Sequence, residues 1–265
     1  MTELADDKET AERARAAASL LLEAGDRLVA SHLSLPVENY KVVLGVYSWW
    51  RLVNRTSAAV LLLVDNGYTA PEVAPLMRNI FNHAYAINWL VDNGEAAVDA
   101  LVSVGAGERE KLQGWLDRTG WPIAAQYRAE IDAYTAANPE PVRDGAAEAL
   151  HKRLKDELGN VATMLERYGS ADIYPVYKHL SGMSHTSVQT ASAYLAQDAS
   201  SGDVQVRSTA VDLGYAYVIQ LTIALLQAAH VFSPLLDGDP LRPAVDQAIA
   251  DLGLEGLQVV PTRTP

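Results

Sequence analysis

The chain has 265 residues, of which 49% are hydrophobic and 20% are charged, and its formal net charge at pH 7 is −12. This composition is ordinary for a globular protein with a buried core, and the length suits one large helical domain or two small ones. The absence of cysteine excludes disulfides, thiolate zinc sites and a cysteine nucleophile. The acidic balance disfavours extended nucleic-acid binding. Residues 1–15 are charged and lack the apolar stretch of a secretory signal, so we expect a cytoplasmic protein.

Helical periodicity dominates the first half of the sequence, and no segment alternates apolar and polar residues for long enough to predict a strand. Leu35-Pro36 separates the first two helices, because proline cannot continue a helix. Gly67 is a typical residue just beyond a helix end, and Thr69 is a typical N-cap. The predicted helices of this half span residues 3–33, 38–66, 69–93 and 95–118.

The second half continues the helical pattern, with a Pro-rich linker over residues 138–141 and a polar loop over residues 198–208, where a short hairpin at 204–206 is left open. Its predicted helices span residues 121–137, 142–168, 173–197, 210–236 and 240–252. Long helices joined by short loops predict an all-α antiparallel bundle of eight or nine helices. We expect a single domain over residues 1–253 and a loose tail over residues 254–265.

Residues 213–236 contain no charged side chain and form a stretch long enough to span a bilayer. However, Gln220, Gln227 and His230 interrupt the stretch, and no cluster of lysine or arginine flanks it. We therefore predict that this helix is the central helix of the bundle, and that the protein has no membrane partner.

Arg78 is an arginine in an apolar stretch of the third predicted helix, and an unpaired arginine is costly to bury. At 100° per residue, Asn82, Tyr85 and Trp89 follow it along one side of the helix. This placement indicates the edge of the core or the wall of a cleft. The structural alternative is an ion pair between Arg78 and an acidic residue of a neighbouring helix.

A second polar stripe lies on the predicted helix 173–197. Tyr177, Ser181 and His185 are spaced at i, i+4 and i+8, which places them along one side of a helix. With Arg78, Asn82 and Tyr85 they predict a polar cleft that binds a small anionic ligand or a protein partner. The alternative is a structural network between helices, in which Ser181 bonds its own backbone and a tyrosine satisfies His185.

The two segments together resemble a bacterial family of uncharacterised helical proteins. The pattern of that family is Arg-x-x-x-Glu followed by Trp-Leu, and then Tyr-x-x-Leu-Ser-x-x-x-His on a later helix. Here it reads Arg78-x-x-x-Asn82 and Trp89-Leu90, then Tyr177-x-x-Leu180-Ser181 and His185. The resemblance spans about residues 57–235. Asn82 departs from the glutamate of the pattern, and because an amide is a poor base and a poor metal ligand, chemistry that depends on that glutamate would be lost or altered here.

The segment from Arg78 to His83 also resembles the Arg-x4-6-His motif of the HEPN superfamily, whose members are helical bundles and often dimeric, metal-independent ribonucleases. Asn79 directly follows the arginine, a place where that motif commonly has a polar residue. The resemblance implies that Arg78 would steady the scissile phosphate. His83 would move protons to and from the ribose 2′-hydroxyl.

Other chemistries lack their motifs. The sequence has no Gly-x-Ser-x-Gly, no phosphate-binding glycine loop and no Rossmann fingerprint, so neither a hydrolase of that class nor a nucleotide cofactor is predicted. Glu148-x-x-His151 has the spacing of di-iron bundles, but the motif occurs once and lies in a charged segment typical of a solvated helix face. We therefore predict no metal site and no cofactor.

Two hypotheses follow, and both expect a homodimer. In the first, the protein is a binding or regulatory module with the cleft described above. In the second, it is an RNA-cleaving toxin or defence effector that uses Arg78, Asn79 and His83. The nuclease needs Arg78 and His83 to face one groove within about 4–6 Å of each other, directly or across a two-fold axis. His83 in an apolar core, with Arg78 against Tyr177 and His185, would exclude it.

Overall fold

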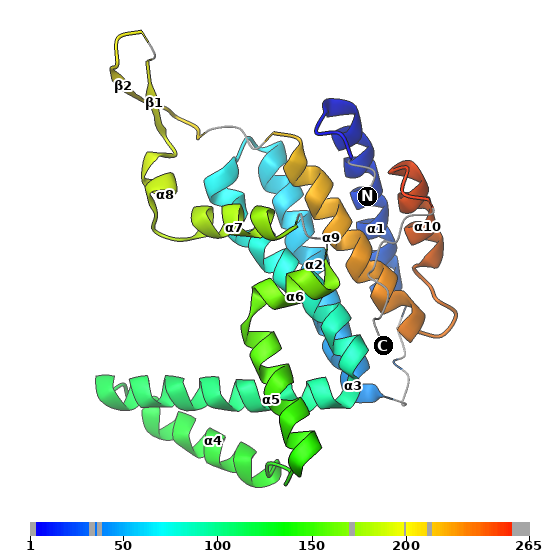
Figure 1. Ribbon diagram of the computed structural model, residues 1–265, viewed down its shortest axis with the longest axis vertical. Helices are drawn as coiled ribbons and strands as arrows, with labels where there is room; N and C mark the ends of the chain where they lie inside the picture. The colour runs from blue at the N-terminus through cyan, green and yellow to red at the C-terminus, as the bar shows by residue number, and fades with distance from the viewer. Residues whose placement is uncertain are drawn as a thin grey trace. The chain divides into compact units, whose positions relative to one another are not determined.

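The computed structural model describes residues 4–31, 35, 39–169, 173–198, 200–210 and 214–255. The predicted all-α fold class is confirmed, with a two-stranded hairpin as an addition (Figure 1). The elements in chain order are α1 (Lys8–Ala30), α2 (Tyr40–Asp65), α3 (Ala70–Thr119), α4 (Ala124–Ala137), α5 (Gly145–Gly159), α6 (Val161–Tyr168), α7 (Ile173–Ser184), α8 (Val188–Ser192), β1 (Leu195–Gln197), β2 (Val204–Val206), α9 (Ala216–Phe232), the 3-10 turn η1 (Ser233–Leu235) and α10 (Arg242–Asp251).

The chain folds as two compact units. The first unit comprises residues 1–92 and 162–265, and the second comprises residues 93–161. The predicted loose tail lies outside the described residues from position 256 onward.

The core of the first unit forms where α1 packs against α9 and α10, and α2 packs against α9 (Figure 1). Small residues on the inner face of α1 allow close approach, and Ala14 and Ala17 are fully buried there. A Cβ atom added to Gly25 would lie 2.6 Å from Oδ1 of the buried Asn54, so only glycine fits without a shift. The Thr222 hydroxyl of α9 donates a 3.0 Å hydrogen bond to the Ala14 carbonyl. These helices therefore meet almost backbone to backbone.

An aromatic cluster joins α2 to α9 in this core. The Trp50 ring is fully buried and stacks on Phe232, with 4.5 Å between ring centroids. Tyr47 completes the cluster, and its centroid lies 6.0 Å from each of the other two. Offset stacking of this kind adds to the large apolar area that such rings bury.

The predicted central helix begins later than expected, at Ala216 instead of position 210. The stretch Ala216–Leu235 is long and apolar enough to cross a membrane, and 61% of its most hydropathic window is buried inside the protein. Burial of this extent against α1, α2 and α10 is what a core helix of a bundle requires.

His230 in the last turn of α9 gives the first unit a pH-dependent stability. Partial burial and then the charge of Arg242 lower the pKa of His230 below its ordinary value of 6.5, against the opposing charges of Asp239 and Asp246. The unfolded chain therefore binds a proton more readily than the folded chain. We expect the free energy of unfolding to fall as the pH drops below about 6.5.

Urea unfolding at several pH values between 7.5 and 5.5 measures this effect. The variant His230→Gln should show a flatter pH profile than the wild type, because it removes the group that takes up the proton. The variant His179→Gln is the matched control, since His179 is exposed. If the free energy of unfolding depended on pH equally in the wild type and in His230→Gln, His230 would not be the group responsible.

The start of α3 is held by Thr69 and Glu72. The Glu72 carboxylate accepts hydrogen bonds from the Thr69 backbone N–H (2.8 Å) and hydroxyl (3.0 Å), which confirms the predicted helix start. Its other oxygen accepts a hydrogen bond from Tyr194, just before β1. Partial burial acts to raise the pKa of Glu72, but these hydrogen bonds outweigh it, so the pKa is lowered. One carboxylate thus caps α3 and holds the segment before the hairpin.

Gly94 divides α3 into two helical segments. Its φ of 56° and ψ of −136° lie where glycine is favoured, and the helix direction breaks there. The predicted boundary between residues 93 and 95 is therefore correct. Neither Gly105 nor Gly107 breaks the second segment.

Two predicted helices are shorter than expected. The helix predicted over residues 142–168 is divided at Asn160 into α5 and α6. The helix predicted over residues 173–197 ends at Ser184, and α8 and β1 follow. Strands β1 and β2 form an antiparallel pair in which Leu195 lies opposite Val206. The hairpin left open at 204–206 is therefore present.

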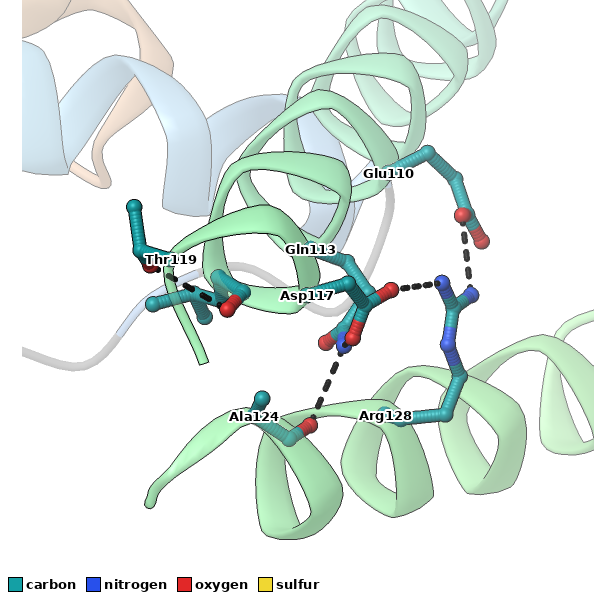
Figure 2. Close-up of polar contacts among 7 residues, drawn as sticks. Glu110, Gln113, Asp117, Thr119, Ala124 and Arg128 are labelled. Carbon is teal, nitrogen blue, oxygen red and sulfur yellow. Dashed lines mark hydrogen bonds and ion pairs between the residues drawn. The ribbon is translucent and has the colours of Figure 1, made fainter. Parts of the chain in front are cut away.

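The second unit is built on a clasp between the end of α3 and the start of α4 (Figure 2). Arg128 of α4 bridges two carboxylates of α3, Glu110 at 3.0 Å and Asp117 at 3.4 Å. The pKa of Arg128 is raised, and the largest cause is its hydrogen bond to Glu110. Gln113, which is fully buried, donates to the Asp117 carboxylate (2.6 Å) and to the Ala124 carbonyl (3.1 Å). These polar contacts fix the turn between the two helices.

Candidate functional site

Arg78 of α3 lies against the polar residues of α7 and of the turn that follows it. Its Nε donates a 3.0 Å hydrogen bond to the Tyr177 hydroxyl, and its Nη1 lies 2.8 Å from Nε2 of His185. The guanidinium carbon also lies 5.6 Å from the centroid of the Tyr177 ring. Residues about a hundred positions apart in the sequence therefore form one cluster, which we call the Arg78 cluster: Arg78, Tyr177 and His185.

The hydrogen bonds of the Arg78 cluster determine where its protons lie. A guanidinium can only donate, so Nε2 of His185 accepts and carries no proton in this arrangement. His185 is then neutral, with its proton on Nδ1. The Tyr177 hydroxyl accepts from Arg78, and no described residue accepts the proton of that hydroxyl.

No described carboxylate pairs with Arg78, although its side chain is half-buried. An ion pair between Arg78 and an acidic residue of a neighbouring helix, the structural alternative for this arginine, is thus not found among the described residues. Arg78 uses one N–H on Tyr177 and one on His185, and a guanidinium has five. The remaining N–H groups carry positive charge without a described acceptor.

The end of α7 places His185 beside Arg78. The Ser184 hydroxyl bonds back to the Leu180 carbonyl at 2.6 Å, and the helix ends there. Ser187 and Thr190 then form a reciprocal capping box that starts α8. The Thr190 hydroxyl also donates to the His185 carbonyl at 3.1 Å. His185 is therefore held in a short turn between two helices, and not on the helical stripe that the sequence predicts.

The other predicted binding residues lie on the same two elements without joining these hydrogen bonds. Asn82 is one helical turn beyond Arg78, and its Oδ1 is buried without a hydrogen-bond partner. Tyr85 is buried, and desolvation raises its pKa well above the ordinary value of 10.0. Ser181 is half-buried on α7 between Tyr177 and His185, and no described residue bonds its side chain.

Asn79 and His83, the other residues of the HEPN-like segment, make contacts separate from the Arg78 cluster. Nδ1 of His83 lies 2.8 Å from the Asn79 carbonyl, so this nitrogen carries the proton and donates. The His83 ring is half-buried and meets the Trp49 ring edge-on, at 6.1 Å between centroids. His83 thus contacts α2, whereas Arg78 contacts α7 and the turn after it.

His151 in the second unit differs from its prediction. The sequence places it on a solvated helix face, but it is buried on α5, and both ring nitrogens lack a hydrogen-bond partner. Leu154, one turn further along, is also buried, so this face of α5 points inward. No group of three or more metal-ligating side chains occurs among the described residues.

A pocket of about 340 Å³ lies where α2 ends and α3 and α9 begin. None of its described lining residues is charged, and none belongs to the predicted site. Its described lining consists of Val64, Gly67, Tyr68, Thr69, Thr209, Ala210, Gly214, Tyr217 and Val218. Burial raises the pKa of Tyr217 to about 12, which keeps its hydroxyl neutral. The sequence does not predict this pocket, because the residues that form it come from segments that are far apart in the chain.

Comparison with protein-family models places most of the chain in a family. Residues 43–203, more than half of the chain, match the family of unknown function DUF5677. All three residues of the Arg78 cluster lie within the matched region. Neither a search of curated proteins nor a search of solved structures gives a match. The chain therefore belongs to the family of unknown function DUF5677.

Proposed function

We propose that the protein binds a small anionic ligand at the Arg78 cluster and acts as a binding or regulatory module. The observation that carries the proposal is the state of Arg78, a half-buried guanidinium that two neutral partners hold in place and no described carboxylate neutralises. A half-buried cation favours an anion more strongly than an exposed one, because water screens it less.

The geometry of the donors suits a carboxylate or a phosphate. The planar guanidinium presents parallel N–H groups that match two oxygens of either anion. Tyr177 fixes the plane of this fork through Nε, so Nη2 and the second N–H of Nη1 remain available. Because two partners already orient Arg78, a ligand would pay little of the entropy of ordering its long side chain.

Tyr177 and His185 would assist the anion in different ways. The Tyr177 hydroxyl has its own proton to donate, since Arg78 supplies the hydrogen bond that the oxygen accepts. His185 is exposed and sits at the outer side of the cluster. An anion that binds the free N–H groups of Arg78 would lie beside His185.

A binding role accounts for these contacts better than ribonuclease activity does. Arg78 makes the contacts with Tyr177 and His185 that weigh against the nuclease, whereas His83 is occupied with Asn79 and Trp49. His83 is half-buried beside an aromatic ring and is not enclosed in an apolar core, so the ribonuclease hypothesis stays a prediction. Incubation of the purified protein with structured and single-stranded RNA in EDTA decides it, with His83→Ala as the control.

Isothermal titration with a panel of anions tests the proposal. Acetate, orthophosphate and pyrophosphate would be titrated into the full chain and into the variant Arg13→Ala. Arg13 is an exposed cation of α1 whose described hydrogen bond is to Thr10, so the control removes one charge elsewhere. We expect saturable binding of at least one anion, with one site per chain, that Arg13→Ala leaves unchanged. If Arg13→Ala weakened the binding of the anion, the binding would depend on the overall charge of the chain, and this result would contradict a site at Arg78.

A further inference from the structure

The second unit, residues 93–161, has a small core for its length, and every residue in it is described. Ile131 and Leu154 are its only large aliphatic side chains that are buried. The remaining buried residues are Ala97, Ala100, Gln113 and His151. A unit of this size normally needs a larger apolar core or additional contacts, because small domains bury too little surface.

The same unit exposes large apolar side chains around the turn between α3 and α4. Trp115 and Trp121 are each 62% exposed, Ile123 is 50% exposed and Leu112 is 48% exposed. We call these four residues the hairpin patch, after the helical hairpin that α3 and α4 form, which is distinct from the β1–β2 hairpin. Single exposed hydrophobic residues are normal, but two half-exposed tryptophans within a few residues of two aliphatic side chains mark an interaction surface. By contrast, Trp50 and Trp89 of the first unit are fully buried.

The charges around the hairpin patch balance locally, although the whole chain carries a net charge of −12. Residues 108–118 contain three acidic side chains and three basic ones. Each basic residue there already has a partner within the chain. Lys111 pairs with Glu108 at 2.7 Å, and Arg118 and Arg109 lie over the rings of Trp115 and Tyr134.

We propose that the hairpin patch is the surface through which two copies of this chain associate. Copies with a net charge of −12 repel each other, and a neutral apolar surface is where that repulsion is weakest. The alternating acidic and basic side chains of residues 108–118 are also compatible with a two-fold interface, in which the same residues of both copies face each other. The four side chains offer roughly 500 Å² of apolar area per copy. With a polar rim, that approaches the roughly 800 Å² per partner of a standard interface.

The Arg128 clasp gives this surface the rigidity that an interface needs. It holds α4 on α3 (Figure 2), and the turn between these two helices carries Trp121 and Ile123. Aromatic anchors on a rigid element lose little conformational entropy on binding, and tryptophan is enriched at the energetic centres of interfaces. The proposal is independent of the anion site, which lies in the other unit.

Sedimentation analysis of the full chain over a concentration series tests the proposal. We expect a dimer in the wild type, and we expect Trp121→Lys and Trp115→Lys each to raise its dissociation constant at least about tenfold. Leu62→Lys is the matched control, because Leu62 is 64% exposed on α2 and outside the patch, and the charge change is the same. A monomeric wild type at all concentrations would overturn the proposal. A dimer that the two tryptophan variants leave intact would also overturn it.

The absence of cysteine allows a second measurement that does not depend on the tryptophan variants folding. Ile123→Cys places one thiol in the hairpin patch, and Leu62→Cys places one outside it. Under mild oxidation we expect Ile123→Cys to form a covalent dimer far faster than Leu62→Cys. Equal rates would contradict the interface. If the wild type were a monomer that co-sediments with zwitterionic lipid vesicles, the hairpin patch would bind a membrane surface. That result would overturn the dimer proposal.

Discussion

Replacing Trp50 with alanine is expected to lower the free energy of unfolding by about 3–5 kcal/mol, the largest effect of any single change considered for the first unit. The ring is fully buried between α2 and α9 and stacks on Phe232. Its edge lies near Gly25 of α1, where an added Cβ atom would lie 3.2 Å from Cζ2 of Trp50. Alanine would leave a cavity at the junction of three helices, and helices in such close contact cannot collapse far to fill it.

Two further variants make this prediction specific. Trp50→Phe keeps a ring on Phe232 and removes the indole N–H, which has no hydrogen-bond partner, so its loss of stability should be much smaller. Tyr68→Ala removes an aromatic side chain of the same unit that is about half exposed. Urea unfolding followed by circular dichroism measures all three. A loss for Trp50→Ala no larger than for Tyr68→Ala would contradict the packing described.

Replacing Arg78 with alanine is expected to weaken anion binding at least about tenfold. A hydrogen bond from a charged donor is worth about 1.5–3 kcal/mol, and a tenfold change in affinity corresponds to about 1.4 kcal/mol. Arg78→Lys should fall between the wild type and the alanine variant, because lysine keeps the charge but lacks the planar fork. The measurement is the same titration for each variant, with the best-bound anion of the wild type.

Tyr177→Phe separates charge from orientation within the Arg78 cluster. It removes the hydroxyl that holds Nε while keeping the ring beside the guanidinium, so we expect a weakening of two- to tenfold. The effects of Arg78→Ala and Tyr177→Phe should not add in the double variant, because the two residues are in contact. Full additivity would show that Tyr177 acts independently of Arg78. Thermal unfolding of each variant shows whether the fold is retained.

Much of the fold follows from local chemistry that is visible in the sequence. The stop at Gly67 and the boundary at Gly94 both use a residue whose backbone preferences are strong. Thr69 with Glu72 is a recognisable helix start. The end of α7 could not be predicted in the same way. Its stop depends on serine and threonine hydroxyls that bond nearby backbone, and these residues also occur inside helices.

The division of residues 142–168 into α5 and α6 was missed for a different reason. Gly159-Asn160 is a local stop signal, but apolar periodicity continues across it and favoured one long helix. The partition into two units was also not visible. Residues 93–161 have the helical pattern of the rest of the chain, and only the packing of their side chains shows how small their core is.

The candidate site was predicted from residue types, and its hydrogen bonds needed the structure. Arg78, Tyr177 and His185 stood out as polar groups on apolar segments. Asn82 and Ser181 were predicted with them because helical spacing aligned them, but the turn after Ser184 brings His185 to Arg78 by another route. Helical spacing describes neighbours on one helix, whereas a site between helices depends on how the helices are placed.

The central claim is that Arg78, with Tyr177 and His185, binds an anion. Nitrogen NMR of the histidine rings during titrations with acetate, orthophosphate and pyrophosphate in turn tests it most directly, because the resonances of His185 and His179 can be followed in one sample. In the free protein we expect Nε2 of His185 to be unprotonated, as its contact with Arg78 requires. On titration the His185 resonances should shift and saturate, while those of the exposed His179 stay in place. Unchanged His185 resonances throughout the titration, or equal shifts at both histidines, would contradict the claim.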